Sequence, residues 1–161
     1  MKDLRSVIEM EKEAERRYRE LAEKSDNSWL KSIMVLLAEE EARHHNYYRG
    51  LEEGVRSGMK DSELVSAVKQ VFLKIRETKD VSGIGVSEID LYRRALEAEK
   101  EHTKFYLNKA EEVKTEAERQ MFLQVAAEER RHAGVLQNVV DFVSRPQEWL
   151  EDAEWYHLED Y

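Results

Sequence analysis

The 161-residue sequence contains no cysteine, one proline and six glycines. The lack of cysteine excludes disulfides, thiolate nucleophiles, zinc ribbons and iron–sulfur clusters built from these residues. The scarcity of proline and glycine leaves long stretches without helix breakers, which favours long helices. No apolar run has the length of a membrane span or the pattern of a secretion signal, so we expect a cytoplasmic protein without a membrane partner.

Basic residues are also fewer than acidic residues. The sequence has 26 Lys and Arg against 35 Asp and Glu, a formal net charge of −9. This balance argues against nucleic acid or an anionic membrane surface as a partner. The length fits one domain with a real hydrophobic core. We expect a helical bundle over residues 1–145 and an aromatic tail over residues 146–161, which contains Trp149, Trp155, Tyr156 and His157 and packs on the bundle.

One pattern occurs twice in the chain. In each half a glutamate is followed seven positions later by a tyrosine, and further along a second glutamate is followed three positions later by a histidine. The two sets are Glu11, Tyr18, Glu41 and His44, and then Glu99, Tyr106, Glu129 and His132. Each member of the second set lies 88 positions after its counterpart (99 − 11, 106 − 18, 129 − 41 and 132 − 44). The offset indicates two similar halves.

Four stretches have apolar residues at the heptad-like spacing of a helical bundle, over residues 4–21, 30–51, 92–110 and 122–143. A short turn at residues 25–27 predicts that the first two helices are antiparallel neighbours. A long crossover with a short helix over residues 61–77 separates the second helix from the third. Ser87 and Thr115 are predicted to cap the third and fourth helices, and Pro146 to end the fourth. The predicted fold is therefore an all-α four-helix bundle.

A carboxylate interrupts the apolar stripe of each predicted helix, and in three helices a histidine follows one turn later. Positions i and i+3 share one face of a helix, so Glu41 with His44 and Glu129 with His132 can point into the same core. Four clustered carboxylates are costly to bury unless they are protonated or paired, and two divalent ions would balance their charge of −4. These residues, together with Glu11 and Glu99, are the ligand set of a dinuclear carboxylate site in a bundle.

Simpler explanations compete for several residues. Any single Glu-x-x-His can belong to a solvated face. We interpret Glu154-x-x-His157 in the tail as structural rather than as a metal site. Tyr18 and Tyr106 either fill the core or hydrogen-bond a ligand carboxylate. His102 also lies three positions after a glutamate, Glu99, and the corresponding position in the first half is Ala14. For His102, a role in core packing or in supporting a ligand is favoured over a role as a metal ligand. Glu101 lies off the apolar stripe, and its expected position is in solvent.

These residues resemble the ferritin-like superfamily, and within it the diiron domain of rubrerythrin. Residues 8–22 and 37–44 resemble the first two helices of that domain, and residues 99–106 and 126–132 resemble the third and fourth. The resemblance spans about residues 3–144. It implies a ferritin-like bundle with two iron ions, or alternatively manganese or zinc. Glu11 and Glu99 would be terminal ligands, Glu41 and Glu129 bridging ligands, and His44 and His132 nitrogen ligands.

The resemblance also implies an activity carried by these same six residues. Rubrerythrins reduce hydrogen peroxide, so we expect an oxidoreductase that reduces peroxide or uses dioxygen to oxidise ferrous iron. Without cysteine the chain has no rubredoxin-type site, so the electron donor would be external, such as a rubredoxin-like protein. The resemblance further implies a homodimer. Alternatives are iron handling without turnover and a helical interaction module stabilised by metal.

One feature of rubrerythrins has no clear counterpart in the sequence. Their third helix carries an extra carboxylate that lets one iron change ligands. Aligned from Tyr106 backward, Glu101 is the candidate, but it would reach the site only through a bulge in the helix. If Glu101 points outward, either His102 or no residue takes that place, and peroxidase activity loses support.

Overall fold

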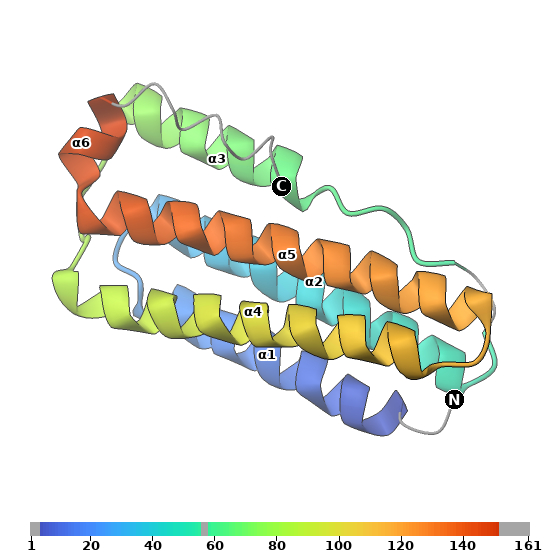
Figure 1. The fold of residues 1–161 in the computed structure, drawn as a ribbon. Helices are drawn as coiled ribbons and strands as arrows, with labels where there is room; N and C mark the ends of the chain where they lie inside the picture. The colour runs from blue at the N-terminus through green and yellow to red at the C-terminus, as the bar shows by residue number, and fades with distance from the viewer. Residues whose placement is uncertain (1–3, 56–57, 152–161) are drawn as a thin grey trace. The chain divides into compact units, whose positions relative to one another are not determined.

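A computed structural model describes residues 4–55 and 58–151, and the regular structure in this part of the chain is entirely helical (Figure 1). The helices are α1 (Leu4–Lys24), α2 (Ser28–Glu52), α3 (Leu64–Thr78), α4 (Ile89–Glu112), α5 (Glu116–Ser144) and α6 (Pro146–Glu151), with a 3-10 turn at Val86–Glu88. The all-α prediction is confirmed. The chain divides into two compact units, Met1–Gly83 and Ile84–Tyr161.

The first unit is built on the helix pair α1 and α2, which pack along each other as an antiparallel hairpin joined by residues 25–27. Apolar residues at heptad-like spacing form the buried stripe of each helix, because they fall on one face. The buried apolar residues include Val7, Ala14 and Leu21 of α1, and Leu30, Met34 and Leu37 of α2. Helix α3 packs against α2.

Asn27 holds the turn of this hairpin together. Its side-chain oxygen accepts hydrogen bonds from the backbone N–H groups of Trp29 and Leu30, both at 3.1 Å, and so caps the start of α2. Its side-chain amide donates to the backbone oxygens of Asp80 at 3.2 Å and Ser82 at 2.9 Å. One fully buried amide therefore fastens the chain after α3 to the turn before α2.

Replacing Asn27 should separate the stability contributed by its helix cap from that contributed by its amide hydrogen bonds. Asn27→Ala removes both the cap and the donor, and we expect it to lower the free energy of unfolding by about 2–3 kcal/mol. Asn27→Ser keeps a capping oxygen but not the amide donor, and should recover about 1 kcal/mol of that loss. Urea unfolding of the three proteins measures both effects. Equal stability of the Ala and Ser variants would contradict the assigned cap.

Helix α3 begins three residues later than the sequence predicted. Ser62 explains the later start, because its hydroxyl accepts a hydrogen bond from the backbone N–H of Leu64 at 3.1 Å. The same hydroxyl donates to the carboxylate of Glu40 on α2 at 2.9 Å. Arg43 also contacts this segment through the backbone oxygen of Lys60 at 2.8 Å. Contacts with α2 thus fix where α3 starts.

The second unit contains the antiparallel pair α4 and α5. Thr115 caps α5 as predicted, because its hydroxyl accepts from the backbone N–H of Glu118 at 3.2 Å. The predicted cap at Ser87 is wrong: α4 follows a 3-10 turn, and its N-cap residue is Glu88, which makes no side-chain capping bond. The 3-10 turn leads the chain directly into α4, which removes the need for a side-chain cap at Ser87.

The end of α5 is close to the predicted position. The helix stops at Ser144, and Pro146 opens the short helix α6, where its fixed φ suits a first helical position. Trp149 is buried and packs edge-on against Phe142 of α5, with ring centroids 4.9 Å apart. Trp155, Tyr156 and His157, the remainder of the predicted aromatic tail, lie outside the described residues.

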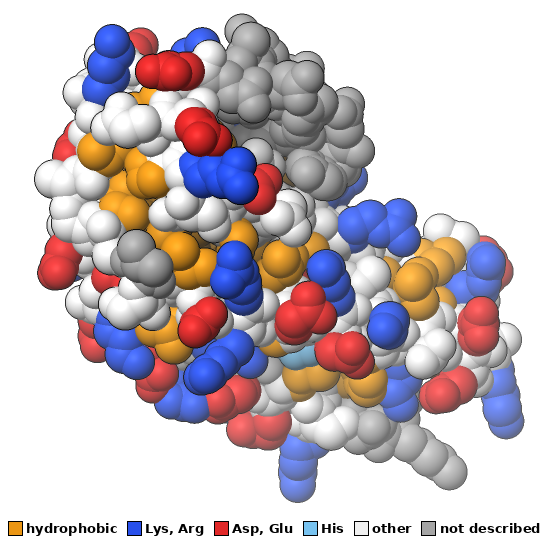
Figure 2. Space-filling view, turned by 60° about the vertical axis from the view of Figure 1, so that its left-hand side comes forward, with side chains coloured by type: hydrophobic (Ala, Val, Ile, Leu, Met, Phe, Trp, Pro, Cys, Tyr) orange, Lys and Arg blue, Asp and Glu red, His pale blue; other side chains and the backbone are white. Residues whose placement is uncertain are grey.

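Charged side chains of both signs are interspersed on the face drawn in Figure 2. Among the described residues, many charged side chains form ion pairs one helical turn apart, as Lys74 does with Glu77 and Lys100 with Glu97. Such exposed pairs contribute little to stability. Within the described part of the chain, no helix combines the length and the apolar character needed to cross a membrane.

Candidate functional site

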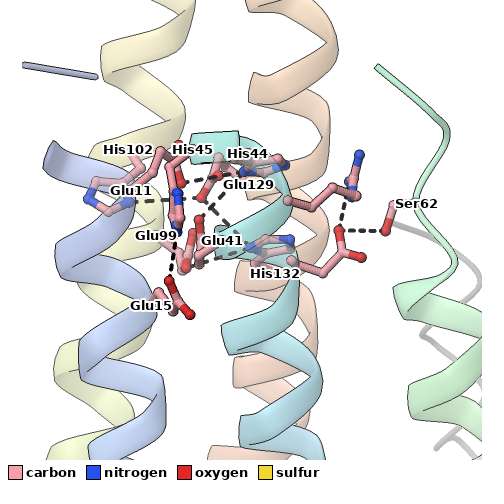
Figure 3. A network of polar contacts seen from close by, with 12 residues as sticks. Glu11, Glu15, Glu41, His44, His45, Ser62, Glu99, His102, Glu129 and His132 are labelled. Atoms are coloured by element: carbon pink, nitrogen blue, oxygen red, sulfur yellow. Dashed lines mark hydrogen bonds and ion pairs between the residues drawn. The ribbon is translucent and has the colours of Figure 1, made fainter. Parts of the chain in front are cut away.

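Three predicted ligands come together in the first unit. Glu11 lies on the buried stripe of α1, and Glu41 and His44 lie one turn apart on that of α2. The Nδ1 atom of His44 is 3.4 Å from a carboxylate oxygen of Glu11 and 3.5 Å from one of Glu41 (Figure 3). All three side chains are 0 % exposed. These residues form the first donor set.

The second unit repeats the arrangement. Glu99 lies on α4, and Glu129 and His132 lie one turn apart on α5. The Nδ1 atom of His132 is 3.7 Å from a carboxylate oxygen of Glu99 and 3.8 Å from Oε2 of Glu129. The three residues are fully buried. They form the second donor set, and each unit therefore carries two buried carboxylates beside one imidazole.

The spacing within each donor set suits a metal ion. Hydrogen bonds between nitrogen and oxygen are usually about 2.7–3.2 Å long, so the N···O distances of 3.4–3.8 Å are too long for good ones. Ligand bonds of about 2.1 Å place neighbouring donor atoms roughly 3.0–3.4 Å apart around one ion. Small side-chain adjustments would bring the donors to that separation. The residues present therefore fit a metal.

Burial changes the acidity of the first donor set. Loss of solvent, followed by the neighbouring Glu41 carboxyl, raises the pKa of Glu11 from its ordinary value of 4.5 to about 7, although His44 acts in the opposite direction. In the metal-free protein Glu11 thus holds a proton up to nearly neutral pH. A cation that binds these carboxylates must displace that proton.

Glu99 is the counterpart of Glu11, but its pKa moves the other way. Burial alone would raise the pKa of Glu99. Hydrogen bonds with Glu129 and His132, and the nearby imidazoles of His132 and His102, outweigh burial and hold this pKa below its usual range. His102 acts on the second donor set from a position where the first half has Ala14. The two sets therefore differ in charge distribution although their donors match.

Glu101 and His102 lie in different environments in the structure. The side chain of Glu101 is 70 % exposed and pairs with Lys104 at 3.6 Å, so its assignment as a residue that supports the site is wrong. Helix α4 continues through this position without a bulge, which leaves Glu101 off the buried face. His102 lies on the inner side, with its Nδ1 atom 3.8 Å from Oε2 of Glu129.

Tyr18 and Tyr106 lie on the buried stripes of α1 and α4, and both are completely buried. The ring of Tyr106 stacks with that of Phe122 of α5, with centroids 6.1 Å apart. Core packing is therefore part of the role of Tyr106. A hydrogen bond from either phenol to a ligand carboxylate remains a prediction.

The sequence reasoning missed a hydrogen-bonded pair beside the first donor set. His45 donates from Nε2 to a carboxylate oxygen of Glu15 at 2.7 Å (Figure 3). Arg19 donates to the same carboxylate at 3.0 Å. Burial would raise the pKa of Glu15, but these partners outweigh it and lower the pKa. The missed signal was spacing: Glu15 and His45 each lie four positions after a predicted ligand, Glu11 and Glu41.

The fold and the donor sets define a class of protein: all-α, with buried Glu and His donors that suggest a diiron-type metal site. The family model for rubrerythrin matches residues 2–138 and, in a second match, residues 90–157. The chain belongs to the rubrerythrin family, and its fold class is the ferritin-like bundle. The second match begins 88 residues after the first (90 − 2), the offset of the repeated motif. A comparison with curated proteins gave no match, and neither did one with solved structures.

Proposed function

We propose that the two donor sets bind two iron ions and that the protein is a diiron oxidoreductase, which reduces peroxide or oxidises ferrous iron. The observation that supports this most strongly is the matched pair of buried sets, each with two carboxylates and one imidazole. Membership of the rubrerythrin family supports the same assignment. Glu11, Glu41, His44, Glu99, Glu129 and His132 are the proposed ligands.

The chemistry of the donors favours iron or manganese. Carboxylate oxygens are hard ligands, and a single imidazole for each metal suits Fe(II), Fe(III) or Mn(II) better than copper. Four carboxylates carry a charge of −4 when ionised, which two divalent ions balance. When bound, two redox-active ions would supply two electrons to one substrate. Zinc could occupy the same ligands in protein as purified, since it accepts Glu and His.

The electrons must come from outside these residues. The chain has no cysteine, so it cannot hold the cysteine-ligated iron of a rubredoxin-type site. We therefore include in the proposal an external donor, such as a rubredoxin-like protein, with peroxide or dioxygen as the small substrate. A cytoplasmic location and a homodimer belong to the same proposal.

Metal content and reactivity test this function together. Protein purified without chelator is analysed for metal, loaded anaerobically with ferrous iron, and mixed with one equivalent of peroxide or with dioxygen while near-ultraviolet absorbance is followed. We expect about two irons per chain and rapid oxidation. A well-folded protein that binds no metal would overturn the proposal, and so would a two-metal protein that neither oxidant changes.

One observation favours a second candidate function. Glu101 is exposed, so α4 lacks the additional inward carboxylate that the resemblance to rubrerythrin leads one to expect. Without it, the two ions could serve iron handling or hold the helices together without catalytic turnover. Slow oxidation by peroxide combined with strong stabilisation by metal would identify this second function. Rapid, repeated turnover with an added electron donor would identify the oxidoreductase.

A further inference from the structure

We propose that His102 is a third imidazole ligand of the metal centre and binds an ion that Glu129 also binds. This inference rests on the proposed function, because it adds a ligand to the same dinuclear site. His102 lies three positions after Glu99 on α4, the spacing that also relates His132 to Glu129 on α5. Both α4 and α5 thus carry a glutamate and a histidine one turn apart on the inner face.

The contact with Glu129 carries the argument. Oε2 of Glu129 is 3.8 Å from Nδ1 of His102 and also 3.8 Å from Nδ1 of His132. One carboxylate oxygen therefore faces two imidazole nitrogens at the same distance. The contact with Glu129 is thus the same for both histidines, although His132 also lies 3.7 Å from Glu99 and His102 is 13 % exposed.

A hydrogen-bonded histidine would look different in this protein. His45 and Glu15 form such a pair, and their atoms are 2.7 Å apart. The Nδ1 atom of His102 is buried and makes no hydrogen bond among the described residues. Its 3.8 Å separation from Glu129 leaves a gap of the kind found between the predicted ligands, 3.4 Å in the case of His44 and Glu11. Leaving a buried ring nitrogen without a hydrogen bond is costly, and a bound cation would remove that cost.

The first unit has no counterpart of this histidine. The position 88 residues before His102 is Ala14, which is fully buried on α1. A centre with three imidazoles therefore has unequal ions, because one of them gains a nitrogen ligand that the other lacks. An added imidazole increases affinity most for metals late in the divalent series, such as Co(II) and Zn(II), relative to Mn(II). We therefore expect two distinct steps when Co(II) is added to the metal-free protein.

Cobalt substitution tests the ligand directly. Each histidine bound to high-spin Co(II) through one ring nitrogen keeps an N–H on the other, which gives a strongly shifted proton resonance that disappears in D2O. We expect three such resonances in the Co(II)-loaded protein and two in His102→Ala. We also expect His102→Ala to weaken one binding step by about tenfold or more. Glu101→Ala, on the exposed side of the same helix, is the matched control and should leave three resonances.

The outcomes separate this inference from the function on which it rests. Two exchangeable resonances in the wild-type protein that persist in His102→Ala would overturn the role of His102 but keep His44 and His132 as ligands. No shifted histidine resonance at all would overturn the dinuclear site, and the inference with it. Helical content measured by circular dichroism shows whether His102→Ala still folds. If it does not, His102→Phe, which keeps a planar ring without a nitrogen, takes its place and should likewise show two resonances.

Discussion

Glu129→Ala is expected to reduce the bound metal from two ions per chain to at most one. Oε2 of Glu129 lies 3.8 Å from both His132 and His102, so its loss removes the carboxylate that both imidazoles face. Alanine also leaves the remaining ligands with less negative charge to balance two cations. Metal analysis after equilibration with excess Fe(II) or Co(II) and gel filtration measures the result.

Two further variants control for volume and for charge. Glu129→Gln keeps the size of the side chain but not its negative charge, and should also lose at least one ion. Glu101→Ala removes one negative charge from the surface of α4, where the side chain is 70 % exposed, and should keep both ions. Glu41→Ala makes the corresponding change in the first donor set and should behave like Glu129→Ala. Equal metal content in all of these proteins would contradict the ligand assignment.

A further comparison uses the isolated Glu-x-x-His of the tail. Glu154 and His157 match the motif but lie outside the described residues and have no partner at the 88-residue offset. Glu154→Ala is therefore expected to leave both ions in place. If it reduced metal content as strongly as Glu129→Ala, the motif alone, rather than its repeated position on the helix pairs, would account for metal binding.

Much of the fold could be predicted from the sequence because the relevant signals are local. Apolar residues at heptad-like spacing predicted the four long helices, and Thr115 and Pro146 marked real boundaries for reasons that act within one or two turns. The grouping of Glu41 with His44, and of Glu129 with His132, follows from helical spacing alone. The offset of 88 residues then predicted which residues of the two halves correspond.

The features that sequence reasoning missed depend on contacts between elements. Helix α3 starts at Leu64 because Ser62 contacts both that residue and Glu40 of α2, which no local pattern indicates. The pairing of Glu15 with His45 joins two helices, and its residues look like ordinary surface charges when each helix is considered alone. The environment of His102 depends in the same way on Glu129 of the neighbouring helix.

The second large effect is an unusual pH dependence of the metal-free protein. The pKa of Glu11 is about 7 in the folded state, against an ordinary value of 4.5. Below pH 4.5 the folded and unfolded chains both carry this proton; between pH 4.5 and about 7 only the folded chain keeps it. The free energy of unfolding should therefore fall as the pH rises through this window, by roughly 3 kcal/mol for a shift of this size.

Glu99 does not mask this effect, because its pKa is shifted in the opposite direction. A carboxyl with a lowered pKa stabilises the fold above its ordinary value of 4.5 and loses that contribution only as the pH falls below it. The contribution of Glu99 therefore changes in more acidic solution than that of Glu11. Urea unfolding of chelator-treated protein at pH 5 and pH 7.5 compares stability across the window in which Glu11 titrates.

Glu11→Gln provides the control, because a neutral amide of similar size cannot titrate. The metal-free variant should have a smaller difference in stability between pH 5 and pH 7.5, and should equal or exceed the wild-type protein at the higher pH. Metal should reverse the trend in the wild-type protein, since a cation binds the ionised carboxylate and higher pH then favours the loaded state. If the pH dependence of the metal-free protein were unchanged in Glu11→Gln, the raised pKa would belong to another group.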